Sequence, residues 1–312
     1  MRALLASAAA AGLALAALGC GLGAGRAPSA VQLLVTRDFG ARALRLDRAP
    51  HVAGQETVMS LLLRNHRVGT RYGGGFVQSI DGLAGGQEGG HSVDWFYYVN
   101  GVEARKGAAA TNVNAGDHIW WDRHDWSATN DVPAVVGSFP EPFLNGIEGK
   151  RLPVRVECAD VEGFPCHAVV QRLRALGVPA AIAGLGSAGE IASIRVLVAP
   201  WRQIAGGVGG DPAIESIARG PRASGVYAVF SQDGSSLTLQ DQDGAAVRTL
   251  GAGAGLIAAT RSGEDAPVWV VTGTDAAGLQ EAASDFSAKQ LDDRFAVAVA
   301  GGQAIPLPEA RR

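Results

Sequence analysis

Aromatic residues, cysteines and methionines are scarce in this sequence. Phe, Trp and Tyr together make up 6% of the 312 residues, and the chain has three cysteines and two methionines. So few cysteines exclude a disulfide-dense scaffold, and the lack of C-x-x-C, H-E-x-x-H and His-x-His patterns gives no support to a metal site. The sequence therefore predicts neither a bound metal nor a catalytic cofactor.

An excess of charge of one sign is also missing. The 27 basic and 30 acidic residues are interspersed and give a formal charge of −3, so there is no basic stripe for nucleic acid. The 43 glycines follow no fixed period, which excludes a collagen-like chain or a solenoid. With 47% hydrophobic residues the chain can bury a sizeable core, and its length predicts two domains.

The N-terminal residues predict export. Arg2 precedes the Ala- and Leu-rich run in "MRALLASAAAAGLALAALGC", which is too short for a confident membrane span and ends in small residues, as secretory signals do. The stretch "ALGC" also resembles the lipobox of bacterial lipoproteins. We expect a signal peptide over residues 1–20, lipidation of Cys20, a flexible tether over 21–30 and anchoring to the outer face of the cell membrane. Ordinary secretion is the alternative.

The other two cysteines fit an oxidising compartment. Cys158 and Cys166 stand eight residues apart in "ECADVEGFPC", around Gly163 and Pro165, and this spacing can close a small loop. We expect a Cys158–Cys166 disulfide, and two free core cysteines are the alternative.

The stretch "VDWFYYVNGVEA", residues 93–104, concentrates the scarce aromatics in one predicted strand. Asn100-Gly101 is a strong signal for a β-hairpin turn. Before it come two short strands in "VQLLVTRDFG" and "ARALRLDRA" and a helix over 57–64, where Val58, Leu61 and Leu62 share one face. A single helix among several strands predicts an α+β domain of the β-grasp type over residues 31–145.

The order of "TVMSLLL", "YGGGFVQSIDGLAG", "DWFYYVNGVEA" and "NAGDHIWWDRHDW" resembles the C-terminal domain of transcobalamin and intrinsic factor, and its bacterial transcobalamin-like relatives. The resemblance implies a β-grasp that binds a small molecule, with cobalamin or another corrinoid as the candidate ligand, or a partner protein. It places the ligand near turns and strand ends at Tyr72, Ser79, Asp81, Trp95, Asn100, Trp120 and Trp121. The helical barrel that accompanies this domain in the vitamin carriers has no counterpart here.

Both faces of the aromatic strand need an explanation, because successive residues of a strand point to opposite faces. Trp95 and Tyr97 share one face, and Phe96 and Tyr98 share the other. We expect one face to pack on the 57–64 helix, and the other, with Phe96, Tyr98 and Trp120, to meet a ligand, a partner or the second domain. The sequence does not decide which face is the core. In "WWDRHDW" we expect the neighbouring Asp and His side chains to lie in a solvated turn.

The second half predicts a mixed α/β domain of unknown family over residues 150–302, followed by a tail over 303–312. The Pro-containing stretch "VPAVVGSFPEPFLNG" reads as an extended connector. Strand-helix-strand patterns at "KRLPVRVEC" to "SIRVLVAP" and at "APVWVVTG" to "DRFAVAVA" predict two β-α-β units around a hairpin. Thr274 or Asp275 is the natural N-cap of the last helix.

No catalytic signature accompanies these elements, so we do not expect an enzyme. "GLGSAG" lacks the spacing of a nucleophile elbow, and "GAGAGL" has Leu256 where a dinucleotide fingerprint needs a third glycine. The main hypothesis is an extracytoplasmic lipoprotein that binds a small molecule or hands it to an uptake system such as a transporter. The alternative is a cell-surface protein interaction module with no small ligand.

Overall fold

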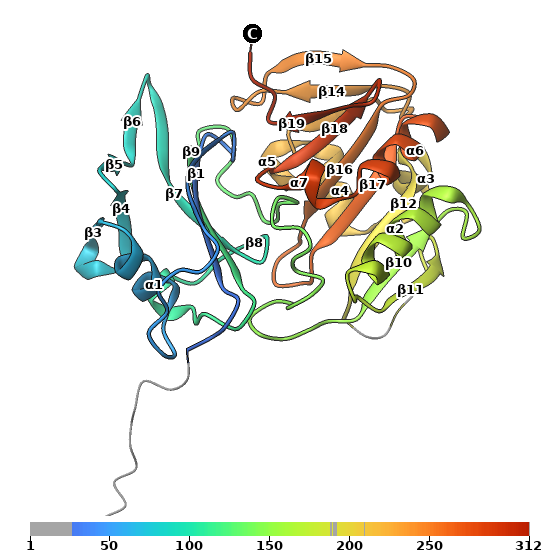
Figure 1. Ribbon diagram of the computed structural model, residues 1–312. Helices are drawn as coiled ribbons and strands as arrows, with labels where there is room; N and C mark the ends of the chain where they lie inside the picture. The colour runs from blue at the N-terminus through green and yellow to red at the C-terminus, as the bar shows by residue number, and fades with distance from the viewer. Residues whose placement is uncertain (1–26, 188, 190–191, 209, 312) are drawn as a thin grey trace, which may run out of the picture.

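The chain folds around two large β-sheets that lie side by side (Figure 1), and two small three-stranded sheets accompany them. The computed structural model describes residues 27–187, 189, 192–208 and 210–311. The expected signal peptide, Cys20 and most of the expected tether lie outside the described residues. Among the helices of the described residues, none has the length and apolar character needed to cross a membrane.

The first sheet belongs to the N-terminal unit, residues 31–126. Its strand order is β2-β1-β9-β7-β6, with β8 paired to β7, and β1 runs parallel to β9 while the other pairs are antiparallel. A small second sheet of β3, β4 and β5 lies beside it. The strands are β1 (Gln32–Arg37), β2 (Arg42–Asp47), β3 (Val68–Arg71), β4 (Phe76–Ile80), β5 (Leu83–Ala84), β6 (Gly86–Glu88), β7 (His91–Val99), β8 (Val102–Glu103) and β9 (His118–Asp125).

The helix expected over 57–64 is α1 (Val58–Asn65), which covers one face of the first sheet. Its N-cap Thr57 accepts a hydrogen bond from the backbone N–H of Ser60, which satisfies one of the free donors of the first turn. The apolar side of α1, including Leu61 and Leu62, is fully buried among residues of β1, β7 and β9. The sheet and this one helix confirm the α+β class for the N-terminal unit.

The second large sheet belongs to the C-terminal unit, residues 153–307. Its strand order is β11-β10-β12-β17-β16-β18-β19, with the first four strands parallel and the last three antiparallel to their neighbours. The strands are β10 (Val154–Cys158), β11 (Ala180–Gly184), β12 (Ile194–Pro200), β16 (Gly255–Thr260), β17 (Val268–Gly273), β18 (Ala296–Ala300) and β19 (Gln303–Leu307).

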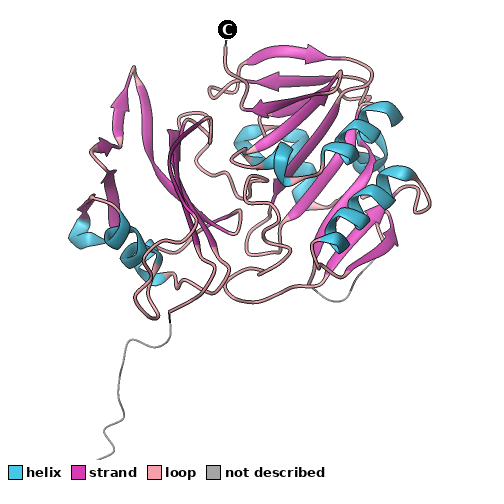
Figure 2. Cartoon of the chain, in the orientation of Figure 1, coloured by secondary structure: helices cyan, strands magenta, loops and turns pink. Residues whose placement is uncertain are grey.

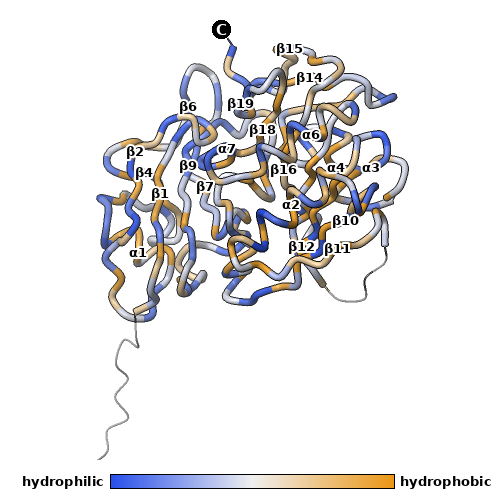
Figure 3. The backbone as a smooth tube through the Cα atoms, turned by 45° about the vertical axis from the view of Figure 1, so that its right-hand side comes forward, coloured by the Kyte–Doolittle hydropathy of each residue, from blue (hydrophilic) through white to orange (hydrophobic). Residues whose placement is uncertain are grey.

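Helices cover both faces of this sheet (Figure 2). One apolar cluster joins one face to α2 (Phe164–Ala175), α6 (Ala276–Asp285) and α7 (Ala288–Leu291), and a second joins the opposite face to α3 (Trp201–Gly207) and α4 (Pro212–Arg219). The short helix α5 (Pro221–Ser224) follows α4 and contacts it. Because both faces are covered, the central strands are mainly hydrophobic along their length (Figure 3).

Two expectations for this unit are refined. The predicted unit from "KRLPVRVEC" to "SIRVLVAP" corresponds to β10, α2 and β12, with β10 and β12 adjacent and parallel, but β11 was not predicted and pairs with β10 on its other side. In the second predicted unit, β17 and β18 are separated by β16. The predicted hairpin is a three-stranded sheet of β13 (Ala228–Phe230), β14 (Leu237–Gln240) and β15 (Ala246–Leu250). The prediction of a tail over 303–312 is corrected, because this range contains β19, which pairs with β18 along its whole length.

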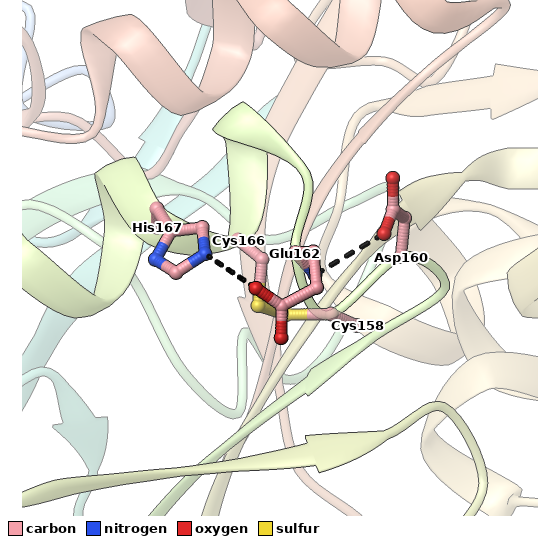
Figure 4. Close-up of a disulfide and its surroundings, with 5 residues drawn as sticks. All are labelled: Cys158, Asp160, Glu162, Cys166 and His167. Carbon is pink, nitrogen blue, oxygen red and sulfur yellow. Dashed lines mark hydrogen bonds and ion pairs between the residues drawn. A yellow bond between two sulfur atoms is a disulfide. The ribbon is translucent and has the colours of Figure 1, made fainter.

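The expected disulfide is present between Cys158 and Cys166, whose Cα atoms lie 5.8 Å apart (Figure 4). Cys158 ends β10 and Cys166 lies in the first turn of α2, so the bond ties the strand to the helix that follows it. Both cysteines are buried, and the polar side chains of Asp160, Glu162 and His167 lie around the connecting loop.

Candidate functional site

The second face of the aromatic strand is buried against the C-terminal unit. Tyr98 and Trp120 are fully buried, and their rings lie 5.5 Å and 5.2 Å from the ring of Phe295, which directly precedes β18. Phe96 stacks at 4.4 Å on His124, which in turn lies 5.4 Å from Phe295. We call this contact between the two units the seam. Of the three alternatives left open for this face, the structure shows contact with the second domain, and the predicted contact of Phe96, Tyr98 and Trp120 with a ligand is corrected.

The connector contributes to the seam and is not a loose extended segment. Val132 and Val135 are buried in the same cluster as Trp120, and Gly137 lies directly against its ring. A Cβ at Gly137 would come within 2.6 Å of the backbone of Arg294 and 2.8 Å of the Trp120 ring, so only glycine allows this approach. Sequence reasoning missed this packing because the prolines of the connector suggested exposure.

The "WWDRHDW" segment forms β9 and is buried, which corrects the expectation of a solvated turn. Asp122 accepts hydrogen bonds from the Thr36 hydroxyl and from the backbone N–H groups of Phe39 and Gly40 at 3.1 and 2.9 Å. Its carboxylate also lies 2.8 Å from Nδ1 of His124. These bonds satisfy the acceptor atoms of a buried carboxylate, so we assign Asp122 a structural role.

Trp95 and Trp121 belong to the core beneath α1, so the predicted contact of these two side chains with a ligand is also corrected. They are 5% and 2% exposed and share a cluster with Leu61 and Leu62. The Trp95 indole donates to the backbone carbonyl of Leu83 at 3.1 Å. Each face of the aromatic strand therefore has its own core within the protein.

Asn100 is also buried, and it has a structural role. It adopts a positive φ of 55° in the β7–β8 turn, donates to Asp117 and to the carbonyl of Gly146 at 2.9 and 2.8 Å, and accepts from the N–H of His118. Its expected contact with a ligand is therefore corrected, because all three bonds tie the turn to the rest of the chain.

The remaining predicted positions lie in and around the β3–β4–β5 sheet. Asp81 accepts from the N–H of Arg67 at 2.9 Å and lies 2.7 Å from Nδ1 of His66, and these bonds lower its pKa against the opposing effect of partial burial. Ser79 pairs with Gly69 across the hairpin. Tyr72 is 85% exposed and is open to solvent. The structure does not gather these three residues into one site with the other six, of which five are buried and Phe96 is partly buried.

A cleft between the two units is the better candidate site. It has a volume of about 680 Å³ and lies between the segment that follows β7, the end of the connector and the loop between β16 and β17. None of the nine residues predicted from the sequence lines it. Its lining consists of Val99, Val102, Glu103, Ala104, Arg105, Lys106, Ala110, Thr111, Asn112, Asn114, Ile147, Glu148, Lys150, Leu152, Arg261, Glu264, Asp265 and Ala266.

The rim of the cleft is made of opposite charges. Arg105 lies 3.4 Å from Glu264 of the other unit, and Lys106 lies 2.9 Å from Glu148 of the connector. These side chains are more than half exposed, so each pair contributes little to stability and can exchange for a charged ligand.

Among the groups that line the cleft, Glu103 has the most strongly shifted pKa. Burial, followed by the nearby charge of Asp131, raises its pKa to about 7, although Arg105 and Arg261 act in the opposite direction. Its carboxylate accepts from the N–H of Val132 at 2.8 Å. A carboxyl group that titrates near neutral pH in a cleft is a functional-site candidate. The only sequence signal for it was its place directly after the Asn100-Gly101 turn.

Comparison with known proteins agrees with part of this description. Residues 55–125 match the model of a domain of unknown function (DUF4430), a transcobalamin-like domain family. The matched range begins before α1 and ends with β9, so it includes both aromatic strands and the N-terminal wall of the cleft. No curated protein and no solved structure matches the chain.

Proposed function

We propose that this protein is an exported lipoprotein that captures a small polar molecule in the cleft between its two units. The observation that carries the proposal is the cleft itself, whose volume of about 680 Å³ suits a small-molecule ligand. Its apolar floor near Val99 and Val102 supplies contact area, and the charged rim supplies orientation.

The family match supports a ligand-binding role for the N-terminal wall of the cleft. The sheet that covers one helix, with β1 parallel to β9 at its centre, is consistent with a β-grasp. In the vitamin carriers that the sequence resembles, such a domain covers one face of cobalamin. We propose that the C-terminal unit here takes the part of the opposing wall, with a corrinoid as the first ligand class to test.

Ala110 and Ala109 offer a matched pair of variants for this test. Both are exposed in the 3₁₀ turn η2 (Ala108–Ala110), but Ala110 lines the cleft and Ala109 does not. Ala110→Trp should fill the cleft, whereas Ala109→Trp adds the same side chain outside it. Wild-type protein is screened by thermal shift against cyanocobalamin, cobinamide and a panel of smaller zwitterionic compounds.

A compound that binds in the cleft should raise the melting temperature of the wild type and of Ala109→Trp, and should have no effect on Ala110→Trp. Equal binding by all three proteins would place the ligand elsewhere and refute the cleft. If no compound in the panel binds, the ligand proposal loses its support.

A protein interaction module is the second candidate function, and strand β2 favours it. Every residue of β2 except Asp47 is exposed, and β2 forms one edge of the first sheet. Leu44 and Leu46 are 48% and 41% exposed on this edge, which can accept a further strand. Loss of partner binding in Leu44→Lys, with the thermal-shift screen negative, would support this alternative.

A further inference from the structure

One histidine and two aspartates converge where β7 begins. His91 is the first residue of β7, Asp125 is the last residue of β9, and Asp243 lies in the turn between β14 and β15. Nδ1 of His91 lies 2.8 Å from Oδ2 of Asp125 and 3.4 Å from Oδ1 of Asp243, and all three atoms lie within 4.8 Å of one another. The cluster draws side chains from both units.

Asp125 is buried with one carboxylate oxygen unsatisfied. Its side chain is 3% exposed, and Oδ1 accepts from the N–H of Ser127 at 2.8 Å. Oδ2 forms no hydrogen bond with any residue that the structure describes, although Nδ1 of His91 is only 2.8 Å away. A buried carboxylate oxygen without a hydrogen bond is costly, and a cation held between these atoms would remove that cost.

The surroundings of the cluster are negative. The fully buried hydroxyl of Tyr227 also lacks a hydrogen-bond partner among the described residues. Burial raises the pKa of Tyr227, and the charges of Asp125, Asp243 and Asp241 raise it further. Arg311 pairs with Asp241 and lies 3.9 Å from Oδ2 of Asp243, which leaves Oδ1 of Asp243 directed to His91.

The two separations that involve Nδ1 of His91 suit a transition metal. With metal–ligand distances of about 2.1 Å, separations of 2.8 and 3.4 Å correspond to ligand–metal–ligand angles of about 84° and about 108°, near octahedral and tetrahedral values. An imidazole ligand favours zinc and its neighbours over Ca²⁺ and Mg²⁺, which prefer sets of oxygen ligands.

We propose that His91, Asp125 and Asp243 bind a divalent transition-metal cation of the zinc type, which clamps the N-terminal unit to the β14–β15 turn of the C-terminal unit. Three protein ligands leave at least one coordination position open to water. The site lies at the opposite end of β7 from Val99 of the cleft, a strand length of about 25 Å. The proposed metal site can therefore be tested independently of ligand binding in the cleft.

The test titrates zinc into metal-free, purified full-length protein by calorimetry, with melting temperature as a second measurement. Wild type should bind one equivalent of zinc and melt at a higher temperature when zinc is present. His91→Ala and the nearly isosteric Asp243→Asn should each weaken zinc binding by at least about tenfold and abolish the thermal shift. His91 and Asp243 are 41% and 36% exposed, so both variants should fold, which circular dichroism can verify.

The matched control is His167→Ala, because His167 is 43% exposed and also lies near a carboxylate, Glu162, at 3.8 Å. This variant should bind zinc like the wild type. The proposal is overturned if the wild type binds no zinc, or if His91→Ala and Asp243→Asn bind it as tightly as the wild type does.

Discussion

The seam predicts that the effects of Trp120 and Phe295 on the free energy of unfolding depend on each other, although the two residues lie in different units. Trp120 is fully buried, its ring lies 5.2 Å from that of Phe295 at an angle of 78°, and its indole donates to the Thr36 hydroxyl at 2.7 Å. Trp120→Ala should lower the free energy of unfolding by about 3–5 kcal/mol, through a lost ring, a lost hydrogen bond and the remaining cavity. Phe295→Ala should cost a similar amount.

The double variant distinguishes a shared seam from two separate cores. Because the two rings contact each other edge to face, the two losses should fall short of adding by about 0.5–1.5 kcal/mol. Trp121 supplies the control, since it neighbours Trp120 in sequence but packs beneath α1. The Trp121→Ala and Phe295→Ala losses should add within about 0.5 kcal/mol.

The assay is equilibrium unfolding in urea, followed by tryptophan fluorescence and by circular dichroism. If the seam is as described, both probes report one cooperative transition in the wild type, because the two units share a core. Additive losses for Trp120 and Phe295, or two separate transitions, would refute the described packing of the aromatic strand.

Four further outcomes can be checked. Tyr98→Phe should leave stability unchanged or raise it by about 1 kcal/mol, because the buried Tyr98 hydroxyl has no partner among the described residues; a clear loss in urea unfolding would reveal one. Replacing Cys158 and Cys166 by serine should cost about 2–3 kcal/mol, the size expected for so short a loop, and an unchanged urea midpoint would argue against the bond. Glu103→Gln should gain stability relative to wild type as the pH rises from 5 to 8, by up to about 3 kcal/mol, because a folded-state pKa of about 7 against an unfolded value of 4.5 makes the wild type lose stability over that window; parallel pH profiles would contradict this. Cys20→Ser should move the protein from the membrane to the soluble fraction, and unchanged fractionation together with an unchanged intact mass would leave only ordinary secretion.

Much of the fold followed from local patterns. The α1 helix, the Asn100-Gly101 turn and the sequence β10, α2, β12 were predicted, because hydrophobic period and turn chemistry are written in neighbouring residues. The short strand β11, which lies between α2 and β12, was not predicted. The disulfide was predicted from spacing alone and is confirmed. β19 was missed because it is an edge strand with Pro306 and mostly partly exposed residues, a weak strand signal.

The site was harder to predict than the fold. Consecutive aromatics showed that both faces of β7 meet something, but the partner of the second face, Phe295, lies almost 200 residues away in sequence. The cleft likewise combines Glu103 with Arg261, and no local pattern links them. The His91, Asp125 and Asp243 cluster escaped motif searches for the same reason, because sheet pairing and the seam assemble it from three segments.

Native mass spectrometry of the protein isolated from the cells that make it would test ligand capture in the cleft most directly. Wild-type protein and Ala109→Trp should carry a noncovalent small molecule, and Ala110→Trp, purified in the same way, should have lost it. A wild-type protein that carries no such adduct, or an Ala110→Trp protein that retains the adduct in full, would contradict capture in the cleft.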